Sequence, residues 1–530
     1  MSSESSAPKG RDILIAGGGT AGWLSACYLA KVLGNRPGAP RITVIESPEI
    51  GTIGVGEGSF ATIRTTLMTL GIDEATFLRE SNATFKQGIR FVDWEKTPLA
   101  GQHDHYFHPF DPPYFVDGAG LLPYWLLQDP KTRPSFAEAV SFQKPVAESQ
   151  RAPKRQHEGG YAGPLNYAYH FDAGKFGALL ARHAKTLGVM HLQGRITDVQ
   201  VDDSGICSLT TDTHGQLSAD FYIDCTGFAA LLIGKALKSP FKSVKDILLT
   251  DRAIACQVPY DAPNSPIESY TISTGHEAGW TWDIGLHSRR GVGYVYASEH
   301  STDDRAEEIL RSYVGPTATD FSARVIKFDT GYREQQWVKN CVSVGLSGGF
   351  FEPLEATGIM MIEVAIGMIA DYFPHSGPLD ASAGLFNRLM TLRNEKTVNF
   401  LKLHYCVTKR TEAFWARNAD NATIPLELQA LLNMWKYRPP SRYDVISDID
   451  TFAYFNYQYI LYGMNFETDL EAARATFPNV EAAYQIFERV KAFGARAKAD
   501  LPTHRALIDA VYAQGFIDKT APNPLMSRSR

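Results

Sequence analysis

Three glycines near the N-terminus have the spacing of a phosphate-binding turn. Gly17, Gly19 and Gly22 form GxGxxG between the apolar stretch 13–16 and a segment with helical spacing of small and apolar residues. In this motif the first glycine permits a tight turn, the second lets backbone approach a pyrophosphate, and the third lets the helix pack against the strand. A second apolar stretch ends in Glu46, 24 residues beyond Gly22, where an acid can bind a ribose hydroxyl. The combination predicts a dinucleotide site rather than a purely structural turn.

A distant segment bears on which dinucleotide is bound. An apolar strand at 221–223 leads through Asp224 to Gly227, in IDCTGF, and a hairpin-like pattern at 196–215 precedes it. A plain strand-to-helix turn would have the same pattern. The long separation from the first motif favours the large flavoprotein plan over a compact NAD domain, so the sequence favours FAD.

The elements that position these residues belong to a large globular chain. It has 530 residues, 44% hydrophobic content and a formal charge of −6, with no basic excess for nucleic acid. The six cysteines include no CxxC pair, so we expect no metal site and no disulfide framework, and reduced thiols favour a cytoplasmic location. The start, MSSESSAPKGRD, lacks the apolar core of a secretory signal, and no run approaches about 18 apolar residues, so we expect no membrane association.

Longer motifs carry a specific resemblance that spans most of the chain. The sequence resembles the flavin-dependent tryptophan halogenase family, and the order of the motifs is also that of the family. The matching segments are GGGTAGW at 17–23, VGEG at 55–58, ATFKQGIRF at 83–91, YFHPF at 106–110, AYHFDAGKFG at 168–177, IDCTGF at 223–228, GWTWDIGL at 279–286 and NCVSVGLSGGFFEPLEATGI at 340–359.

The resemblance implies a reaction divided between two places. Reduced FAD, oxygen and a halide, chloride or bromide, give hypohalous acid, which travels through a tunnel to a lysine beside the aromatic substrate. Lys86 matches that lysine, which would polarise hypohalous acid as an ammonium or form a haloamine after losing its proton. Glu355 matches the glutamate that stabilises the cationic ring intermediate and helps to remove its proton. Glu352 is the competing acid, and the resemblance assigns the role to Glu355.

The resemblance also implies the remaining site residues. Backbone amides of Thr357 and Gly358 would hold the halide near the flavin. The glycine-rich stretch 51–64 would be a strap between flavin and substrate, with Glu57 and Arg64 structural rather than catalytic. The expected cofactor contacts are Gly17, Gly19, Thr20, Ala21, Gly22, Glu46, Val199, Leu346 and Ile359.

Aromatic residues complete the expected substrate side. His108 and Phe110 match positions that pack against an indole, and the aromatic stretch 451–464 lies where relatives complete the pocket. Trp280 and Trp282 match a tunnel motif that keeps substrate away from the flavin. The chain departs from the family at Ala356, where serine is common, and at Gly285, where proline is usual.

These placements predict an α/β fold with an FAD-binding, Rossmann-like body of the flavin monooxygenase type. The body would take 1–100 and 160–380, and a mostly helical substrate-side region would take 101–159 and 381–530. We expect an indolic substrate, either free tryptophan, indole or a larger compound, and a separate flavin reductase, because the sequence holds no second dinucleotide fingerprint. The sequence leaves open a homodimer. An FAD-dependent aromatic hydroxylase and a non-catalytic flavin-binding protein are the alternative functions.

Overall fold

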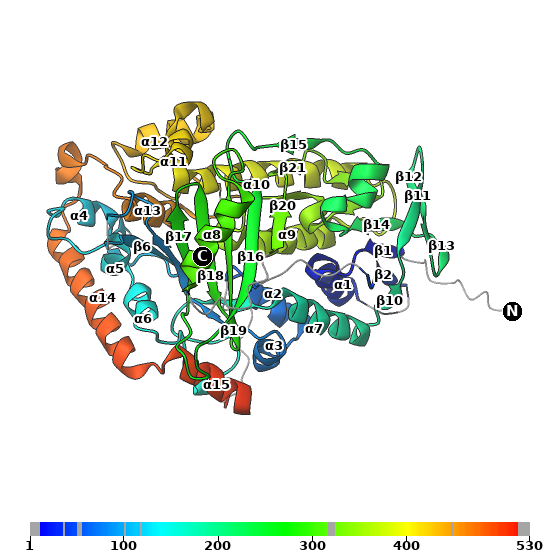
Figure 1. The fold of residues 1–530 in the computed structure, drawn as a ribbon, viewed down its shortest axis with the longest axis horizontal. Coiled ribbons are helices and arrows are strands. Elements are labelled where there is room, and N and C mark those ends of the chain that lie inside the picture. Colours follow the sequence, from blue (N-terminus) through cyan, green and yellow to red (C-terminus); the bar gives the residue numbers. More distant parts are fainter. Residues whose placement is uncertain are drawn as a thin grey trace.

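The computed structural model describes residues 11–34, 36, 38–49, 56–99, 102–116, 119–315, 324–446 and 449–517. Figure 1 shows one sheet near the N-terminal end of the molecule, a second sheet in the middle, and a mainly helical region on the side away from the N-terminus. Within the described residues, no helix has both the length and the apolar character needed to cross a bilayer.

A six-stranded sheet forms the nucleotide-binding half. Its first five strands are parallel neighbours, and the sixth is antiparallel. Every residue of the central strand β1 (Ile13–Ala16) is buried, which explains its continuous apolar sequence. The order is β10 (Met190–Gln193), β2 (Ile42–Glu46), β1 (Ile13–Ala16), β14 (Phe221–Asp224), β23 (Cys341–Ser343) and β22 (Trp337–Val338). Helices α1 (Thr20–Leu33), α7 (Ala173–Thr186) and α9 (Thr357–Tyr372) pack together beside this sheet. The predicted α/β class with a Rossmann-like body is confirmed.

A seven-stranded, mostly antiparallel sheet forms the middle of the molecule. One parallel pair, between β17 and β5, joins its two antiparallel parts. The order is β20 (Arg324–Lys327), β16 (Arg252–Pro259), β19 (Arg289–Tyr296), β18 (Gly279–Gly285), β17 (Thr271–His276), β5 (Gly88–Val92) and β6 (His105–Pro109). All seven residues of β18 are buried, so both faces of this strand are covered.

Small sheets of two or three strands accompany the two large ones. The three-stranded sheet β3 (Glu57–Gly58), β9 (Ala168–Phe171) and β4 (Thr84–Lys86) brings the end of the expected strap beside Lys86. The other small sheets contain β11 (Ile196–Asp202), β12 (Gly205–Thr211) and β13 (Gly215–Leu217); β15 (Phe241–Ser243), β21 (Gly331–Arg333) and β24 (Gly349–Phe350); and β7 (Phe115–Val116) with β8 (Ala119–Gly120).

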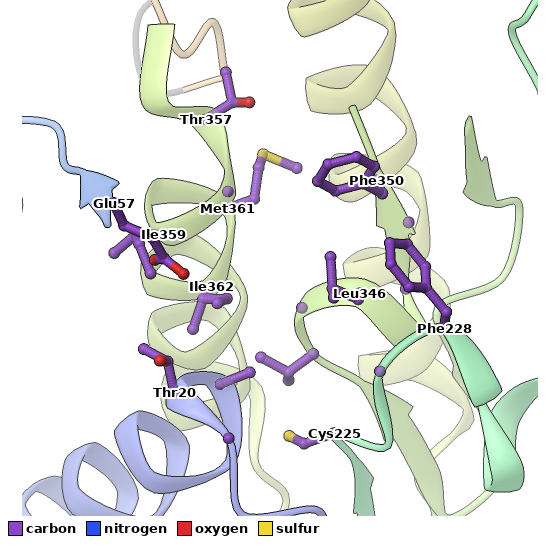
Figure 2. A pocket seen from close by; sticks show the side chains of 18 of the residues that line it. Thr20, Glu57, Cys225, Phe228, Leu346, Phe350, Thr357, Ile359, Met361 and Ile362 are labelled. Atoms are coloured by element: carbon purple, nitrogen blue, oxygen red, sulfur yellow. The ribbon is translucent and has the colours of Figure 1, made fainter. Parts of the chain in front are cut away.

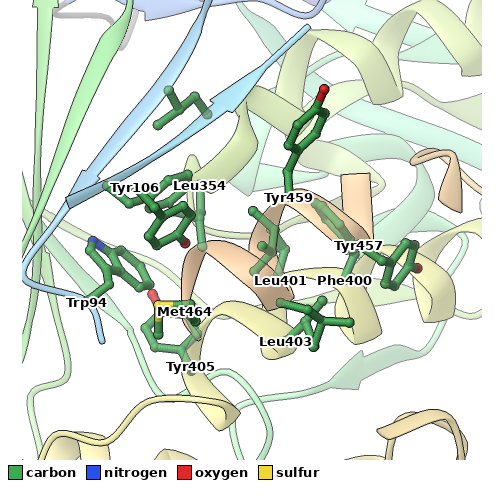
Figure 3. Close-up of a cluster of buried hydrophobic side chains, with 14 of the residues drawn as sticks. Trp94, Tyr106, Leu354, Phe400, Leu401, Leu403, Tyr405, Tyr457, Tyr459 and Met464 are labelled. Atoms are coloured by element: carbon green, nitrogen blue, oxygen red, sulfur yellow. The ribbon is translucent and has the colours of Figure 1, made fainter. Parts of the chain in front are cut away.

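The C-terminal part of the chain is helical and packs on the middle sheet through a large aromatic core (Figure 3). It contains α10 (Asp380–Cys406), α11 (Ala413–Ala419), α12 (Leu426–Trp435), α13 (Tyr454–Gly463), α14 (Val480–Asp500) and α15 (His504–Gln514). The remaining helices are α2 (Ile63–Leu70), α3 (Glu74–Glu80), α4 (Leu122–Leu126), α5 (Phe136–Val140), α6 (Gln143–Glu148) and α8 (Asp303–Val314). Strands β5 and β6 pair across the expected boundary at residue 100, and the proposed division into regions stays a prediction.

Candidate active site

One cavity of about 650 Å³ joins the glycine turn to the expected catalytic residues. Its lining includes Gly17 and Gly19 as well as Lys86 and Glu355. Figure 2 shows part of this lining, with α9 along one side and Leu346, Phe350 and Phe228 facing it across the cavity. The glycine turn and Glu355 therefore face the same space although they lie far apart in the chain.

The glycine turn has the local geometry that its sequence predicts. Gly17 has φ +109°, and a Cβ there would lie 2.2 Å from the backbone oxygen of Cys225. A Cβ on Gly22 would lie 1.9 Å from the oxygen of Gly17, whereas one on Gly19 would meet nothing within 4 Å. Gly17 and Gly22 thus permit close backbone packing, and Gly19 leaves open space on the cavity side.

This end of the cavity fits a dinucleotide such as FAD. Helix α1 begins directly after Gly19 without a side-chain cap, so its first backbone N–H groups are free to face phosphates. Thr20 and Ala21 line the cavity at this helix end, and Glu46 lines it at the end of β2. These residues would hold the pyrophosphate and a ribose hydroxyl.

Val199, a predicted cofactor contact, does not line the cavity. It lies on β11, which pairs with β12 in a separate sheet, and it packs in the small hydrophobic cluster there. Ile196, at the start of the same strand, does line the cavity. The cavity therefore meets β11 at its first residue, and Val199 lies farther along the strand.

The strap is described only from residue 56 onward, and residues 51–55 lie outside the described part of the chain. Glu57 lines the cavity, and burial together with the nearby carboxylate of Asp172 raises its pKa to about 7. Arg64 lies with its guanidinium 4.4 Å from the ring centre of Tyr167, consistent with its predicted structural role.

The expected halide residues lie at the start of α9. Thr357 and Gly358 are the first two residues of this helix, and both line the cavity together with Ile359 and Leu346. The first amides of a helix have no partner within it, and in α9 no capping side chain bonds to them either. Such amides, at the positive end of a helix dipole, favour an anion.

Two consecutive residues before this helix have left-handed backbone. Glu355 has φ +62° and Ala356 has φ +56°. For residues other than glycine this conformation costs on the order of 1 to 3 kcal/mol each and persists only where the surroundings hold it. The strain lies directly between the expected catalytic carboxylate and the expected halide amides.

Lys86 ends β4 and is almost fully buried, with 1% of its surface exposed. Its Nζ donates to the backbone oxygen of Ser59 at 3.3 Å and lies 5.5 Å from the ring centre of Phe110. Burial lowers the pKa of Lys86 to about 8, against the opposing effect of Glu355. An amine with this pKa changes charge near physiological pH, as a reactive lysine requires.

Glu355 is a buried carboxylate held by two histidines. Its Oε1 accepts from Nδ1 of His108 at 2.8 Å and from Nε2 of His404 at 3.0 Å. Burial alone would raise the pKa of Glu355, but His108 and His404 outweigh that effect and hold it well below its usual range. The site therefore keeps a negative charge at a water-poor position, where it interacts strongly with a developing positive charge.

The residues that the sequence predicted as an indole wall divide into two roles. The ring of His108 bonds to Glu355 through one nitrogen and to Asn456 through the other, at 2.9 Å, and it does not line the cavity. Its predicted packing against an indole stays a prediction. Phe110 also lies outside the cavity lining but next to Lys86.

Sequence reasoning missed His404 and did not resolve Asn456. His404 lies in the last turns of α10, outside every motif, while Asn456 lies in the first turn of α13, within the aromatic stretch 451–464. Phe452 from that stretch stacks on Phe400 with ring centres 3.8 Å apart. The only sequence signal for His404 is its position in the mostly apolar stretch FLKLHYC.

Trp280 and Trp282 both line the cavity, as their predicted tunnel role requires. They come from β18, and their ring centres are 6.4 Å apart. The competing acid, Glu352, is fully buried and accepts a hydrogen bond from the indole nitrogen of Trp280 at 2.8 Å. Among the described residues, no group of three or more His, Cys, Asp or Glu side chains could hold a metal ion.

Comparisons with known proteins agree with this geometry. A family model described as tryptophan halogenase matches residues 12–477. A tryptophan 6-halogenase from Streptomyces toxytricini is 35% identical over 85% of this chain and 88% of its own length. A tryptophan 7-halogenase from Lentzea aerocolonigenes is 36% identical over 77% of this chain and 78% of its own. The crystal structure of a tryptophan halogenase from Shewanella frigidimarina superposes with a TM-score of 0.91 at 38% identity, covering 96% of this chain and 98% of that one.

Proposed function

The chain belongs to the tryptophan halogenase family, whose members are flavin-dependent enzymes, and on that premise we propose that it halogenates the ring of an indole or a tryptophan-like arene. The observation that carries the proposal is that the glycine turn, the first residues of α9, Lys86 and Glu355 all line the same cavity. When bound, reduced FAD would supply two of the electrons that reduce O2, and the halide, chloride or bromide, would supply the other two and become hypohalous acid, with water as the second product.

Residues of the cavity guide the halide and the acid formed from it. The amides at Thr357 and Gly358 hold the halide, and the walls formed by Trp280 and Trp282 confine the hypohalous acid to the cavity. Lys86 donates a hydrogen bond to the oxygen of that acid and so makes its halogen more electrophilic. A ring carbon of the arene then forms a bond to the halogen while the bond between oxygen and halogen breaks.

Glu355 completes the reaction. The ring is cationic after the halogen adds, and the buried carboxylate stabilises that charge. The proton leaves the halogenated carbon, with Glu355 as its first acceptor, and restores the aromatic ring. The oxygen of the hypohalous acid leaves as water, so the net change replaces one ring hydrogen with one halogen.

The immediate test is product analysis. The protein is incubated with FAD, NADH, a flavin reductase and either chloride or bromide, together with a panel that includes indole, free tryptophan and larger indolic compounds. We expect halogenated products with the isotope pattern of the halide supplied. Oxygenated products that form equally well without halide would instead support the aromatic hydroxylase. Bound FAD without any product from the panel would favour the flavin-binding protein.

The Lys86→Met variant separates the two halves of the reaction. We expect it to bind FAD and consume oxygen at the normal rate but to lose about 100-fold or more of the halogenated product, because positioning and acid–base help are lost. Near-normal product would remove the assignment of Lys86. Loss of FAD binding would place Lys86 in the cofactor site instead.

The partners and location extend the same proposal. Reduced FAD comes from a separate reductase, because the sequence holds no second dinucleotide fingerprint. All six cysteines are free, consistent with the expected cytoplasmic location. Omitting the reductase tests the first statement, and light scattering measures whether the chain forms the homodimer that the sequence leaves open.

A further inference from the structure

Two neighbouring residues of α10 bind the two acids of the turn that precedes α9. His404 donates to Glu355 at 3.0 Å, and the hydroxyl of Tyr405 donates to Oε2 of Glu352 at 2.7 Å. The turn FEPLEA therefore has a contact with α10 at each end. A helix makes a firm support, because consecutive residues on it have fixed relative positions.

Glu352 also connects this turn to the tunnel strand. The same Oε2 atom accepts from the indole nitrogen of Trp280 on β18 at 2.8 Å. Glu352, Trp280 and Tyr405 are all buried, with exposed fractions of 0 to 1%. A buried carboxylate that lost these donors would be left unsatisfied, so the three side chains are strongly constrained together.

The surroundings of this group are closely packed. Tyr405 lies with Trp94 at 5.1 Å between ring centres, and Trp94 lies 6.1 Å from Trp280. Figure 3 shows Trp94, Leu354 and Tyr405 within one cluster of buried side chains. Packing fixes the rings, and the hydrogen bonds from Trp280 and Tyr405 fix the carboxylate between them.

We propose that Glu352 and Tyr405 are positioning residues that set the reactive geometry of this enzyme. They hold the strained turn that presents Glu355 and the α9 amides, and they hold Trp280 at the cavity wall. The inference rests on the proposed roles of Glu355 and Trp280. Neither Glu352 nor Tyr405 exchanges a proton with the substrate; both act through the residues they hold.

The strained backbone of the turn explains why Glu355 needs positioning residues. The left-handed backbone at Glu355 and Ala356 is strained and would tend to relax to an ordinary conformation. Such a change would displace both the carboxylate of Glu355 and the amide of Thr357. The hydrogen bonds of Glu352 and of Glu355 itself oppose that relaxation. Glu352 lies before them, and its bonds to β18 and α10 come from two separate elements.

Three variants test the proposal. Tyr405→Phe removes one donor, Glu352→Leu removes the acceptor, and Glu352→Gln keeps an oxygen that can accept from both Trp280 and Tyr405. The matched control is Tyr294→Phe, which changes a buried tyrosine on β19 that stacks on Tyr296. For each folded variant, FAD affinity, oxygen consumption, halogenated product per oxygen and the ratio of regioisomers are measured.

We expect Tyr405→Phe and Glu352→Leu to lower product per oxygen by about fivefold or more and to change the ratio of regioisomers, because misplacement of a catalytic group wastes the oxidant. FAD affinity should stay within about twofold of the wild-type value, and Glu352→Gln should keep most of the wild-type product yield. Tyr294→Phe should match the wild type. A purely structural role would lower the melting temperature and leave product per oxygen unchanged, which would overturn the proposal.

A measurement without turnover separates this inference from the proposed function. The indole N–H resonance of Trp280, assigned with Trp280→Phe, should shift in Tyr405→Phe because both donors share one oxygen of Glu352. This result is readable even if the wild type halogenates nothing in the panel. An unchanged resonance would show that the three residues are not coupled. If Glu352→Leu does not fold, Tyr405→Phe decides the question.

Discussion

His404 on α10 donates a hydrogen bond to Glu355, with 3.0 Å between Nε2 and Oε1, although the two residues are 49 positions apart. The other ring nitrogen of His404 lies 2.9 Å from the backbone oxygen of Phe400, which orients the ring. Together with His108, this histidine lowers the pKa of a carboxyl group that burial would otherwise raise. The charge of Glu355 therefore depends on a residue outside the turn that carries it.

Replacing His404 should make halogenation sensitive to acid. If Glu355 works as a carboxylate, product is lost as pH falls through its pKa, which lies below the usual range in the wild type. His404→Leu removes a lowering influence and leaves burial in place, so the pKa rises and the loss of product moves to higher pH. Product per oxygen, measured between about pH 5 and 9, should fall on the acid side only in the variant.

Oxygen consumption is the internal control for this experiment. It should keep its wild-type pH dependence, because His404 does not line the cavity. Identical product profiles for the variant and the wild type would contradict the coupling between His404 and Glu355.

Lys86 should make halogenation by the wild type decline at alkaline pH. Burial lowers its pKa to about 8, so the side chain is an ammonium below that pH and an amine above it. The proposed role requires the ammonium as a hydrogen-bond donor, and product per oxygen should therefore fall as pH rises through about 8. An increase through the same range would show that the amine reacts, as in the haloamine route.

The glycine turn could be predicted because its constraints are local. Gly22 packs against Gly17 within the strand–turn–helix unit, and the motif encodes that contact directly, whereas Gly17 also lies against Cys225, directly after β14. The position of Glu355 beside His108 could not be derived in this way, because it depends on how β6 and α10 pack around the turn. His404 follows no motif, and its function becomes visible only when α10 is placed against the middle sheet.

Two residues predicted to contact a ligand, Val199 and His108, lie outside the cavity lining for the same reason. The predictions for Val199 and His108 rest on the segment in which each lies, but a residue on a strand faces one side or the other, and its partners are chosen by neighbouring strands and helices. The pairing of β11 with β12 places Val199 in a cluster away from the cavity. Hydrogen bonds to Glu355 and Asn456 hold the ring of His108 outside the cavity lining.

A pair of glycine variants separates folding from cofactor binding. Gly17→Ala forces a Cβ against Cys225 in a left-handed backbone, so it should lower the melting temperature by several degrees. Gly19→Leu meets open space and should fold normally, but its side chain should block the approach of the pyrophosphate and weaken FAD binding by about 100-fold. Thermal unfolding without FAD and a fluorescence titration with FAD give the two readouts. Wild-type FAD affinity in folded Gly19→Leu would remove the phosphate-site assignment.

Phe110 should control where the ring is halogenated. Its ring centre is 5.5 Å from Nζ of Lys86 and 5.7 Å from the ring centre of Phe60, which in turn lies 5.8 Å from that of Phe452. These rings form an aromatic surface beside the proposed delivery group, and flat surfaces fix the plane of a flat arene.

Phe110→Ala should therefore raise the KM for an indolic substrate by about threefold to tenfold, as expected for the loss of one aromatic contact, and should broaden the ratio of regioisomers. Flavin reoxidation should be unchanged, because Phe110 does not line the cavity that would hold FAD. Phe115→Ala, at a phenylalanine with 47% of its surface exposed on β7, is the matched control and should leave both KM and regioisomers as in the wild type. If Phe110→Ala also matches the wild type in both, the arene binds against another surface, and the same measurement on Phe452→Ala would locate it on the α13 side of Lys86.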